Sequence, residues 1–111
     1  MKLSEKQSQF LLDVCLLIQW VHRKGMYCTG GELHRLPETQ KILKDQGKSK
    51  TTDGKHQKRL AIDLFFFING KITLNPEDYR EAGEFWESLR EENRWGGHFT
   101  NFVDAVHFER A

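Results

Sequence analysis

Asp63 is a residue whose type and surroundings suggest a catalytic or ion-binding role. It stands in the segment "HQKRLAIDLFFF", residues 56–67, within one of the most apolar runs of the chain. Aspartate is disfavoured in strands, and an ionised carboxylate taken out of water is costly unless something pairs with it. The partner could be a basic residue, a hydrogen-bond donor or a metal ion. The positions of the histidines and of the other carboxylates favour a metal.

Three further residues could share that metal. His56 lies seven residues before Asp63, and "DAVH" near the end of the chain places Asp104 three residues before His107. Two histidines and one carboxylate, with a fourth position for water, form a known catalytic zinc set. Seven extended residues span about 23 Å, so the chain must turn back between His56 and Asp63 to bring both near one ion. Spacing alone leaves another interpretation open, because DxxH is also an ordinary turn or helix-face hydrogen-bond pair.

Helices must position these residues, and the sequence predicts about three. Ser4 and Gln7 form a capping-box pattern and Gly25 stands at a C′ position, which together predict a helix over 5–24. Pro37 and Gly47 bracket a second, shorter helix over 37–46, and Asn75 with Pro76 opens a third. The first helix is expected to bury Phe10, Leu11, Val14, Leu17, Ile18 and Val21. The inner side of the third is expected to hold Tyr79, Ala82, Phe85, Trp86 and Leu89.

Strands are predicted on both sides of a loop-like stretch. "RLAIDLFFFI", "NG" and "KIT" predict a hairpin with an Asn69-Gly70 turn, "MYCT" a short strand, and "RWGGHFTNFVDAVHFER" a bend with a final strand. Strand alternation puts Asp63 on one face with Ala61, Phe65 and Phe67, and puts Leu60, Ile62, Leu64, Phe66 and Ile68 on the other. The predicted fold class is α+β, a small single domain over 1–111 with a short antiparallel sheet.

Composition limits the class of protein. The chain has 111 residues, of which 38% are hydrophobic, enough for one ordinary core. With 17 Lys and Arg against 16 Asp and Glu, net charge predicts neither a nucleic-acid nor a membrane partner. Basic residues gather between 41 and 59 and acidic ones between 77 and 94. The basic stretch is either a solvated loop or a contact for an anionic polymer.

Several familiar classes of site and of targeting signal are not indicated. HExxH, P-loop, GxSxG and GxGxxG motifs are absent from the sequence. Cys15 and Cys28 form neither a CxxC pair nor a disulfide framework and are expected to be buried free thiols. The apolar stretch near the N-terminus contains Asp13 and no cleavage site follows it. The chain is therefore expected to be made in the cytoplasm without a signal peptide or a membrane anchor.

Two segments resemble the motifs of a known family. "HQKRLAIDL" resembles the SxHxxGxAxD motif of the zinc peptidases that include VanY-type D-alanyl-D-alanine carboxypeptidases and phage L-alanyl-D-glutamate endolysins, which have the hedgehog-like metallopeptidase fold. "WGGHFTNFVDAVHFE" is similar to the closing segment of that family, where a carboxylate stands three residues before the last zinc histidine. "GELHRLPETQ" resembles its substrate-arginine segment. The resemblance runs from about Leu11 to Glu109.

The resemblance implies a role for each candidate residue. His56, Asp63 and His107 would bind zinc, Asp104 would be the general base, and Arg35 would hold a substrate carboxylate or carbonyl. Zinc lowers the pKa of a water molecule to about 7, and a nearby carboxylate can move its proton to the leaving amine. The planar guanidinium of Arg35 suits a peptide carboxylate, although a surface ion pair with Glu32 or Glu38 is the alternative.

The implied function is hydrolysis of an amide in bacterial peptidoglycan stem peptides, with L-alanyl-D-glutamate as the leading bond, as in a bacteriophage endolysin. The alternative within the same class is a D-alanyl-D-alanine carboxypeptidase. A non-catalytic zinc-binding or polyanion-binding module is the alternative of another class. The peptidase would act at the cell wall, as a monomer and without a nucleic-acid partner.

The sequence departs from the family pattern at two positions. Gly54 replaces the serine two residues before His56, which removes a hydroxyl that could steer a ligand or substrate. Arg59 replaces the glycine three residues after His56. If that glycine has a positive φ in other members, arginine would be strained there and the turn could differ. Phage-type relatives resemble this sequence in carrying a bulky residue at that place, and Asp104 is nearer their type than the glutamate of the carboxypeptidases.

Overall fold

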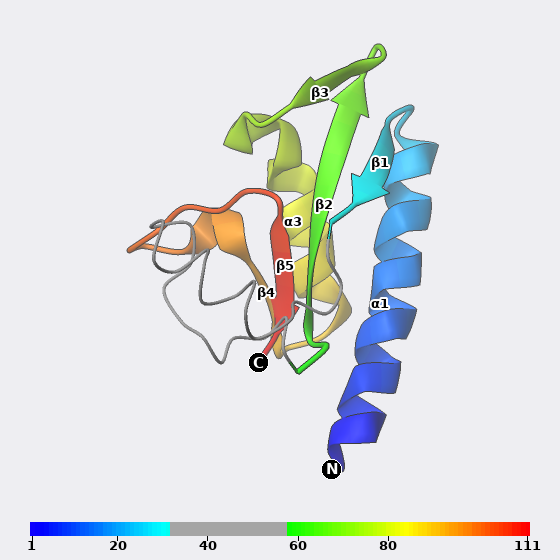
Figure 1. Ribbon diagram of the computed structural model, residues 1–111, viewed down its shortest axis with the longest axis vertical. Helices are drawn as coiled ribbons and strands as arrows, with labels where there is room; N and C mark the ends of the chain where they lie inside the picture. Colours follow the sequence, from blue (N-terminus) through cyan, green and yellow to red (C-terminus); the bar gives the residue numbers. More distant parts are fainter. Residues whose placement is uncertain (32–57) are drawn as a thin grey trace.

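The computed structural model describes residues 1–31 and 58–111, and Figure 1 shows how their helices and strands are arranged. In chain order these are α1 (Leu3–Arg23), β1 (Tyr27–Gly30), β2 (Ala61–Ile68), β3 (Lys71–Thr73), α3 (Pro76–Leu89), β4 (Asn93–Trp95), the 3-10 helix η1 (Gly96–His98) and β5 (His107–Arg110). The α+β class and the antiparallel sheet are confirmed. The helix predicted over 37–46, together with Arg35, Gly54 and His56, lies outside the described residues.

The sheet is organised around β2. Its strands run in the order β1-β2-β5-β4, with β3 also paired to β2, and every pairing is antiparallel. The second half of β2 pairs with β1 and β3, while residues 61–63 pair with β5. Asp63 is therefore the last residue of β2 whose neighbour lies on β5. The strand β4 was not predicted from the sequence.

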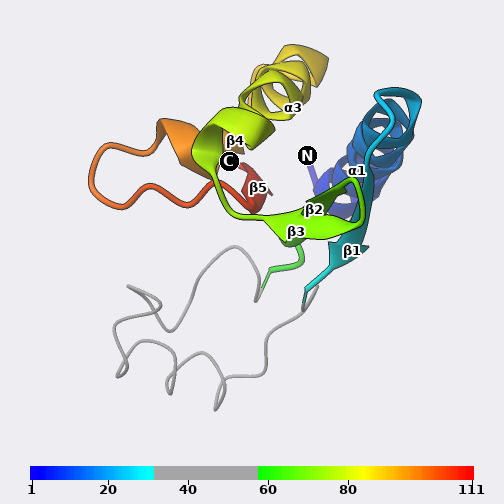
Figure 2. The same ribbon diagram turned by 90° about the horizontal axis from the view of Figure 1, so that it is seen from above.

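Helices α1 and α3 lie on one side of the sheet, as the view from above shows (Figure 2). The alternation predicted for β2 is confirmed, because Ile62, Leu64 and Phe66 are buried while Asp63 is only partly buried. The core that these residues form with the helices also includes Phe10, Val14, Leu17, Val21, Tyr79, Ala82, Trp86 and Phe108. Asp63 thus belongs to the face of the sheet opposite α1 and α3.

The two ends of α1 differ in how well the sequence predicted them. The helix begins at Leu3, its N-cap residue Lys2 makes no side-chain cap bond, and the Gln7 amide donates to the Lys58 carbonyl at 2.9 Å. The predicted capping box is therefore wrong. At the other end Gly25 has φ 82°, and the N–H groups of residues 25 and 26 donate back to the carbonyls of residues 22 and 21. The predicted C′ glycine is confirmed.

One buried residue of α1 was not expected. Leu11 is 59% exposed, contrary to prediction, whereas Asp13 is 2% exposed. The Asp13 carboxylate accepts hydrogen bonds from Arg90 Nε at 2.9 Å and Nη2 at 3.2 Å, and from Asn93 Nδ2 at 3.1 Å. A buried carboxylate is tolerated because these donors satisfy it. This ion pair connects α1 to the segment between α3 and β4.

The two thiols are more exposed than predicted, whereas the hairpin turn forms as predicted. Cys15 is exposed and Cys28 is half-buried, so neither is the buried thiol expected. The hairpin turn is confirmed, because Asn69 and Gly70 have φ 52° and 79°, as a type I′ turn requires. None of the helices in the described ranges is long and apolar enough to cross a membrane.

Helix α3 attaches to the sheet through two aromatic side chains. Asn75 caps the helix by accepting from the Glu77 N–H at 3.1 Å, as its position predicts. The Tyr79 hydroxyl accepts from the Phe66 N–H at 2.9 Å and donates to the Thr73 carbonyl at 2.7 Å. The Trp86 indole donates to the Arg94 and Glu109 carbonyls at 3.2 and 3.0 Å. Trp86 thereby fixes β4 and β5 relative to the helix.

Candidate metal centre

Asp63 and His107 are brought together by the pairing of β2 with β5. They are directly opposite each other in the antiparallel register. Side chains of such a pair lie on the same face, with Cβ atoms about 5 Å apart. The Asp63 Oδ1 to His107 Nδ1 distance is 3.4 Å, and the two side chains are 18% and 11% exposed. The ion-binding pair suggested by the sequence is therefore a cross-strand neighbour pair.

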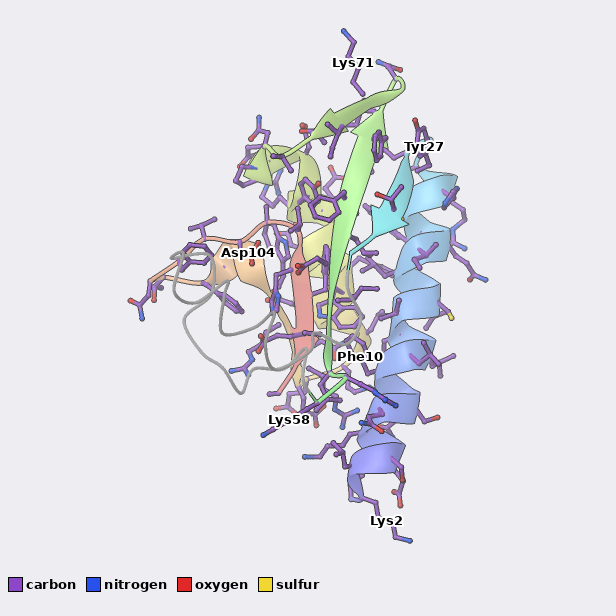
Figure 3. All side chains as sticks on the ribbon, viewed as in Figure 1. Lys2, Phe10, Tyr27, Lys58, Lys71 and Asp104 are labelled. Atoms are coloured by element: carbon purple, nitrogen blue, oxygen red, sulfur yellow. The ribbon has the colours of Figure 1, made fainter. Side chains whose placement is uncertain are left out.

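Asp104 reaches the same place through a turn. It lies on the segment that leads into β5 (Figure 3), and its carbonyl accepts from the His107 N–H at 3.1 Å. Its own N–H donates to the Gly96 carbonyl at 3.0 Å. A Cβ on Gly96 would overlap the Asp104 carbonyl oxygen and lie 2.9 Å from His107 Cβ. Glycine is therefore required at position 96, because the two backbone segments approach too closely for a side chain.

The "WGG" motif before this loop has a packing role. A Cβ on Gly83 or on Gly97 would overlap the Trp95 ring, so the indole lies between these two glycines. The Trp95 indole donates to the Ala105 carbonyl at 2.7 Å, and its backbone N–H donates to Glu87 at 3.0 Å. The residue after Asp104 is thus held by an aromatic side chain that is itself tightly packed.

The donor atoms form a cluster that fits a metal ion. Asp63, Asp104 and His107 each offer one ligand atom, and these three atoms lie within 4.8 Å of one another. Two donors about 2.0–2.1 Å from a tetrahedral zinc ion are about 3.3 Å apart. The 3.4 Å between Asp63 Oδ1 and His107 Nδ1 agrees with this separation. An imidazole with carboxylates is also a donor set that zinc accepts.

Acidic side chains surround the His107 imidazole. Its Nε2 is 2.7 Å from Glu109 Oε1, on the side away from Asp63. Burial lowers the pKa of His107, but the hydrogen bonds to Asp63 and Glu109 and the charges of both carboxylates raise it overall to about 9. Without a cation, both nitrogens of the imidazole therefore carry a proton at neutral pH. A metal ion would have to displace one of these two protons.

Comparison with known proteins identifies the family. Residues 47–110, more than half of the chain, match the model of a family described as D-alanyl-D-alanine carboxypeptidase. The chain belongs to this family. It is therefore a peptidase by family, and the resemblance seen in the sequence is confirmed. Peptidases of the D-alanyl-D-alanine carboxypeptidase family depend in general on zinc, and the Asp63, Asp104 and His107 cluster has a donor set that suits it.

A solved structure shows the same fold. The crystal structure of the Serratia marcescens L-Ala D-Glu endopeptidase ChiX superposes with a TM-score of 0.79, covering 94% of this chain and 79% of the other. The two sequences are 18% identical, so the similarity concerns the fold. No curated protein sequence matched this chain.

Among the residues predicted from the sequence, the structure brings Asp63, Asp104 and His107 into one cluster. His56, the other predicted zinc ligand, and Arg35, the predicted substrate residue, lie outside the described residues, as does Gly54. Arg59 is described, and its φ is 58°. The backbone at position 59 is thus left-handed in this chain, with arginine there.

Sequence reasoning missed Glu109 and Arg94. Arg94 Nη2 is 2.9 Å from Glu109 Oε2, and Glu109 also contacts His107. The signal was present, since "HFE" in a strand places the first and third residues on one face. A hollow of about 400 Å³ adjoins Arg94. Its lining consists of Arg94, His98, Phe99, Thr100, Asn101 and Phe102. The Phe99 ring centroid is 5.8 Å from that of His107, so one residue that lines the hollow also lies next to the cluster.

Proposed function

We propose that this protein is a zinc-dependent peptidase that hydrolyses an amide bond in the stem peptides of bacterial peptidoglycan, most readily the L-alanyl-D-glutamate bond. The observation that carries the proposal is the cluster of Asp63, Asp104 and His107 in a chain of this peptidase family. Asp63 and His107, with His56, would hold the ion. The fold shared with an L-Ala D-Glu endopeptidase and the short carboxylate of Asp104 support the choice of bond.

The residues of the cluster have separate tasks in this proposal. Zinc, when bound, acidifies a water molecule and polarises the scissile carbonyl. The Asp104 carboxylate accepts the proton of the attacking water and returns it to the nitrogen of the leaving amine. Its backbone bonds to residues 96 and 107 hold it beside the ligands. Arg35 would bind a carboxylate of the substrate. The protein would be made in the cytoplasm and would act at the cell wall as a monomer.

Metal content and product analysis test the proposal together. Purified protein supplied with zinc should hold about one ion per chain by inductively coupled plasma mass spectrometry, and Asp63→Asn should hold less. Asp104→Asn should retain zinc but lose about 10²–10⁴-fold in hydrolysis, the usual contribution of a general base. Glu91→Gln, which removes an exposed carboxylate outside the cluster, is the matched control and should change neither quantity.

Mass spectrometry of digested muropeptides identifies the bond. Cleavage between L-alanine and D-glutamate releases the rest of the stem peptide, whereas a carboxypeptidase removes one D-alanine. The second activity is the alternative function, favoured by the description of the family. If zinc is bound and neither product forms, both peptidase assignments fail and a non-catalytic zinc-binding module becomes the better interpretation.

A further inference from the structure

Strand β5 places another carboxylate against the cluster. His107 and Glu109 are two residues apart in the strand, so their side chains point to the same face. The His107 Nε2 to Glu109 Oε1 distance is 2.7 Å, and each side chain is 11% exposed. A hydrogen bond to an ionised acceptor, this short and this well buried, is among the stronger ones in proteins. It constrains the imidazole ring from the side opposite Asp63.

The chemistry of the acceptor determines which ring nitrogen carries the proton. An ionised carboxylate can only accept hydrogen bonds, so Nε2 must be the donor toward Glu109. A bound metal ion replaces the proton on one ring nitrogen, and the ring then keeps a single N–H. The hydrogen bond to Glu109 keeps that N–H on Nε2, which leaves the lone pair on Nδ1. Nδ1 is the nitrogen that faces Asp63 Oδ1, at 3.4 Å. The lone pair therefore points to the place where a metal ion would bind.

We propose that Glu109 is a positioning residue that holds His107 as the Nε2-protonated tautomer and so presents Nδ1 to the metal, with Arg94 keeping Glu109 in place. The inference rests on the proposed function, since it assigns a task to a neighbour of the metal site. Histidine ligands commonly donate their second N–H to a carboxylate, which fixes the ring and raises its basicity. The roles predicted from the sequence did not assign this task to any residue.

Arg94 holds the second oxygen of the same carboxylate. Arg94 and Glu109 are opposite each other in the pairing of β4 with β5, and Arg94 Nη2 lies 2.9 Å from Glu109 Oε2. The Trp86 indole donates to the backbone carbonyls of both residues. The carboxylate is thereby held at both oxygens, one by the guanidinium and one by the imidazole. Its rotation is restricted, and so is that of the ring.

The contacts of Glu109 with Arg94 and His107 predict an unusual effect of the substitution Glu109→Gln. Glutamine has one accepting oxygen and one donating NH₂ group. Because Arg94 can only donate, it should attract the oxygen and turn the NH₂ group toward His107. Nε2 would then have to accept, which puts the proton on Nδ1 and blocks the metal. Replacing Arg94 as well should free the amide to rotate and restore the useful tautomer.

Zinc dissociation constants, measured by competition with a chromogenic chelator, test these steps. Glu109→Ala and Glu109→Gln should each weaken zinc binding about 10–100-fold, the usual effect of removing such a partner. In the Glu109→Gln background, Arg94→Met should recover a large part of that loss. Glu91→Gln, an exposed change of the same kind, is the control and should bind like the parent. Parent-like affinity in both Glu109 variants would overturn the inference.

A second measurement uses the parent protein, so its result does not depend on whether a variant folds. Long-range ¹⁵N–¹H spectra of the zinc-loaded parent protein report which nitrogen of His107 is protonated. We expect a proton on Nε2 and a metal-shifted Nδ1, and coordination through Nε2 would overturn the inference while leaving the proposed function intact. If the parent binds no zinc at all, the proposed function itself fails, and this inference fails with it.

Discussion

Gly96→Ala tests whether the close approach of two backbone segments positions the cluster. The added methyl group would overlap the Asp104 carbonyl oxygen and lie 2.9 Å from His107 Cβ, whereas ordinary contacts begin at 3.4 Å. Neither neighbour is the flexible end of a side chain, so the backbone at Asp104 must move. The displacement is on the order of 1 Å, enough to cost an enzyme about 10²-fold in rate.

The same change also has a cost in stability. Forcing a methyl group into packed structure costs about 1–3 kcal/mol, and losing the Asp104 N–H to Gly96 carbonyl bond costs about 0.5–1.5 kcal/mol. We expect the free energy of unfolding to fall by about 2–4 kcal/mol. For a domain of this size the melting temperature should fall by roughly 10 °C.

The assay combines thermal unfolding, zinc content and the rate of muropeptide cleavage for Gly96→Ala and a matched control. Gly30→Ala is that control, because a Cβ at position 30 meets no atom within 4 Å among residues 1–31 and 58–111. The control should keep the stability of the parent to within about 0.5 kcal/mol. If both variants melt and cleave alike, the backbone approach at Gly96 does not position Asp104 and the reasoning is refuted.

Three other substitutions test the framework around the site by urea unfolding. Asp13→Ala leaves the partly buried Arg90 without its carboxylate and should cost about 3 kcal/mol, and a loss below about 1 kcal/mol would mean that the ion pair is unimportant. Tyr79→Phe removes the acceptor of the buried Phe66 N–H and should cost about 1–3 kcal/mol. Stability equal to that of the parent would show that this N–H finds another partner. Arg59→Gly should be neutral or stabilising by up to about 1 kcal/mol, since the residue has φ 58° and glycine adopts that conformation readily. A loss of stability greater than 1 kcal/mol would show that the arginine side chain contributes more than its backbone strain costs.

The local signals were the most reliable part of the sequence reasoning. The β2 alternation, the Asn69-Gly70 turn, the Asn75 cap and the Gly25 helix end all follow from preferences of one residue and its near neighbours. The α1 capping box failed because Gln7 found a partner at residue 58 rather than in its own first turn. A capping pattern competes with long-range hydrogen bonds, which the sequence does not show.

The candidate site also contains residues that the sequence indicated and residues that it did not. Residue types and spacing pointed to Asp63, Asp104 and His107, and the family motifs strengthened that choice. Glu109 was missed because its role depends on two contacts at once, one along β5 to His107 and one across to Arg94. Asp13 was missed for a similar reason, since its partners Arg90 and Asn93 are more than 70 residues away in sequence.

The sequence by itself predicted the α+β class, the apolar face of β2, the family and the three residues that form the cluster, because these depend on local periodicity and on motifs. Only the tertiary structure decided that Asp63 and His107 face each other at 3.4 Å, since that depends on the register between β2 and β5. The tertiary structure also decided which ring nitrogen of His107 faces Asp63. Register and ring orientation are set by packing between segments distant in sequence, and no local preference specifies them.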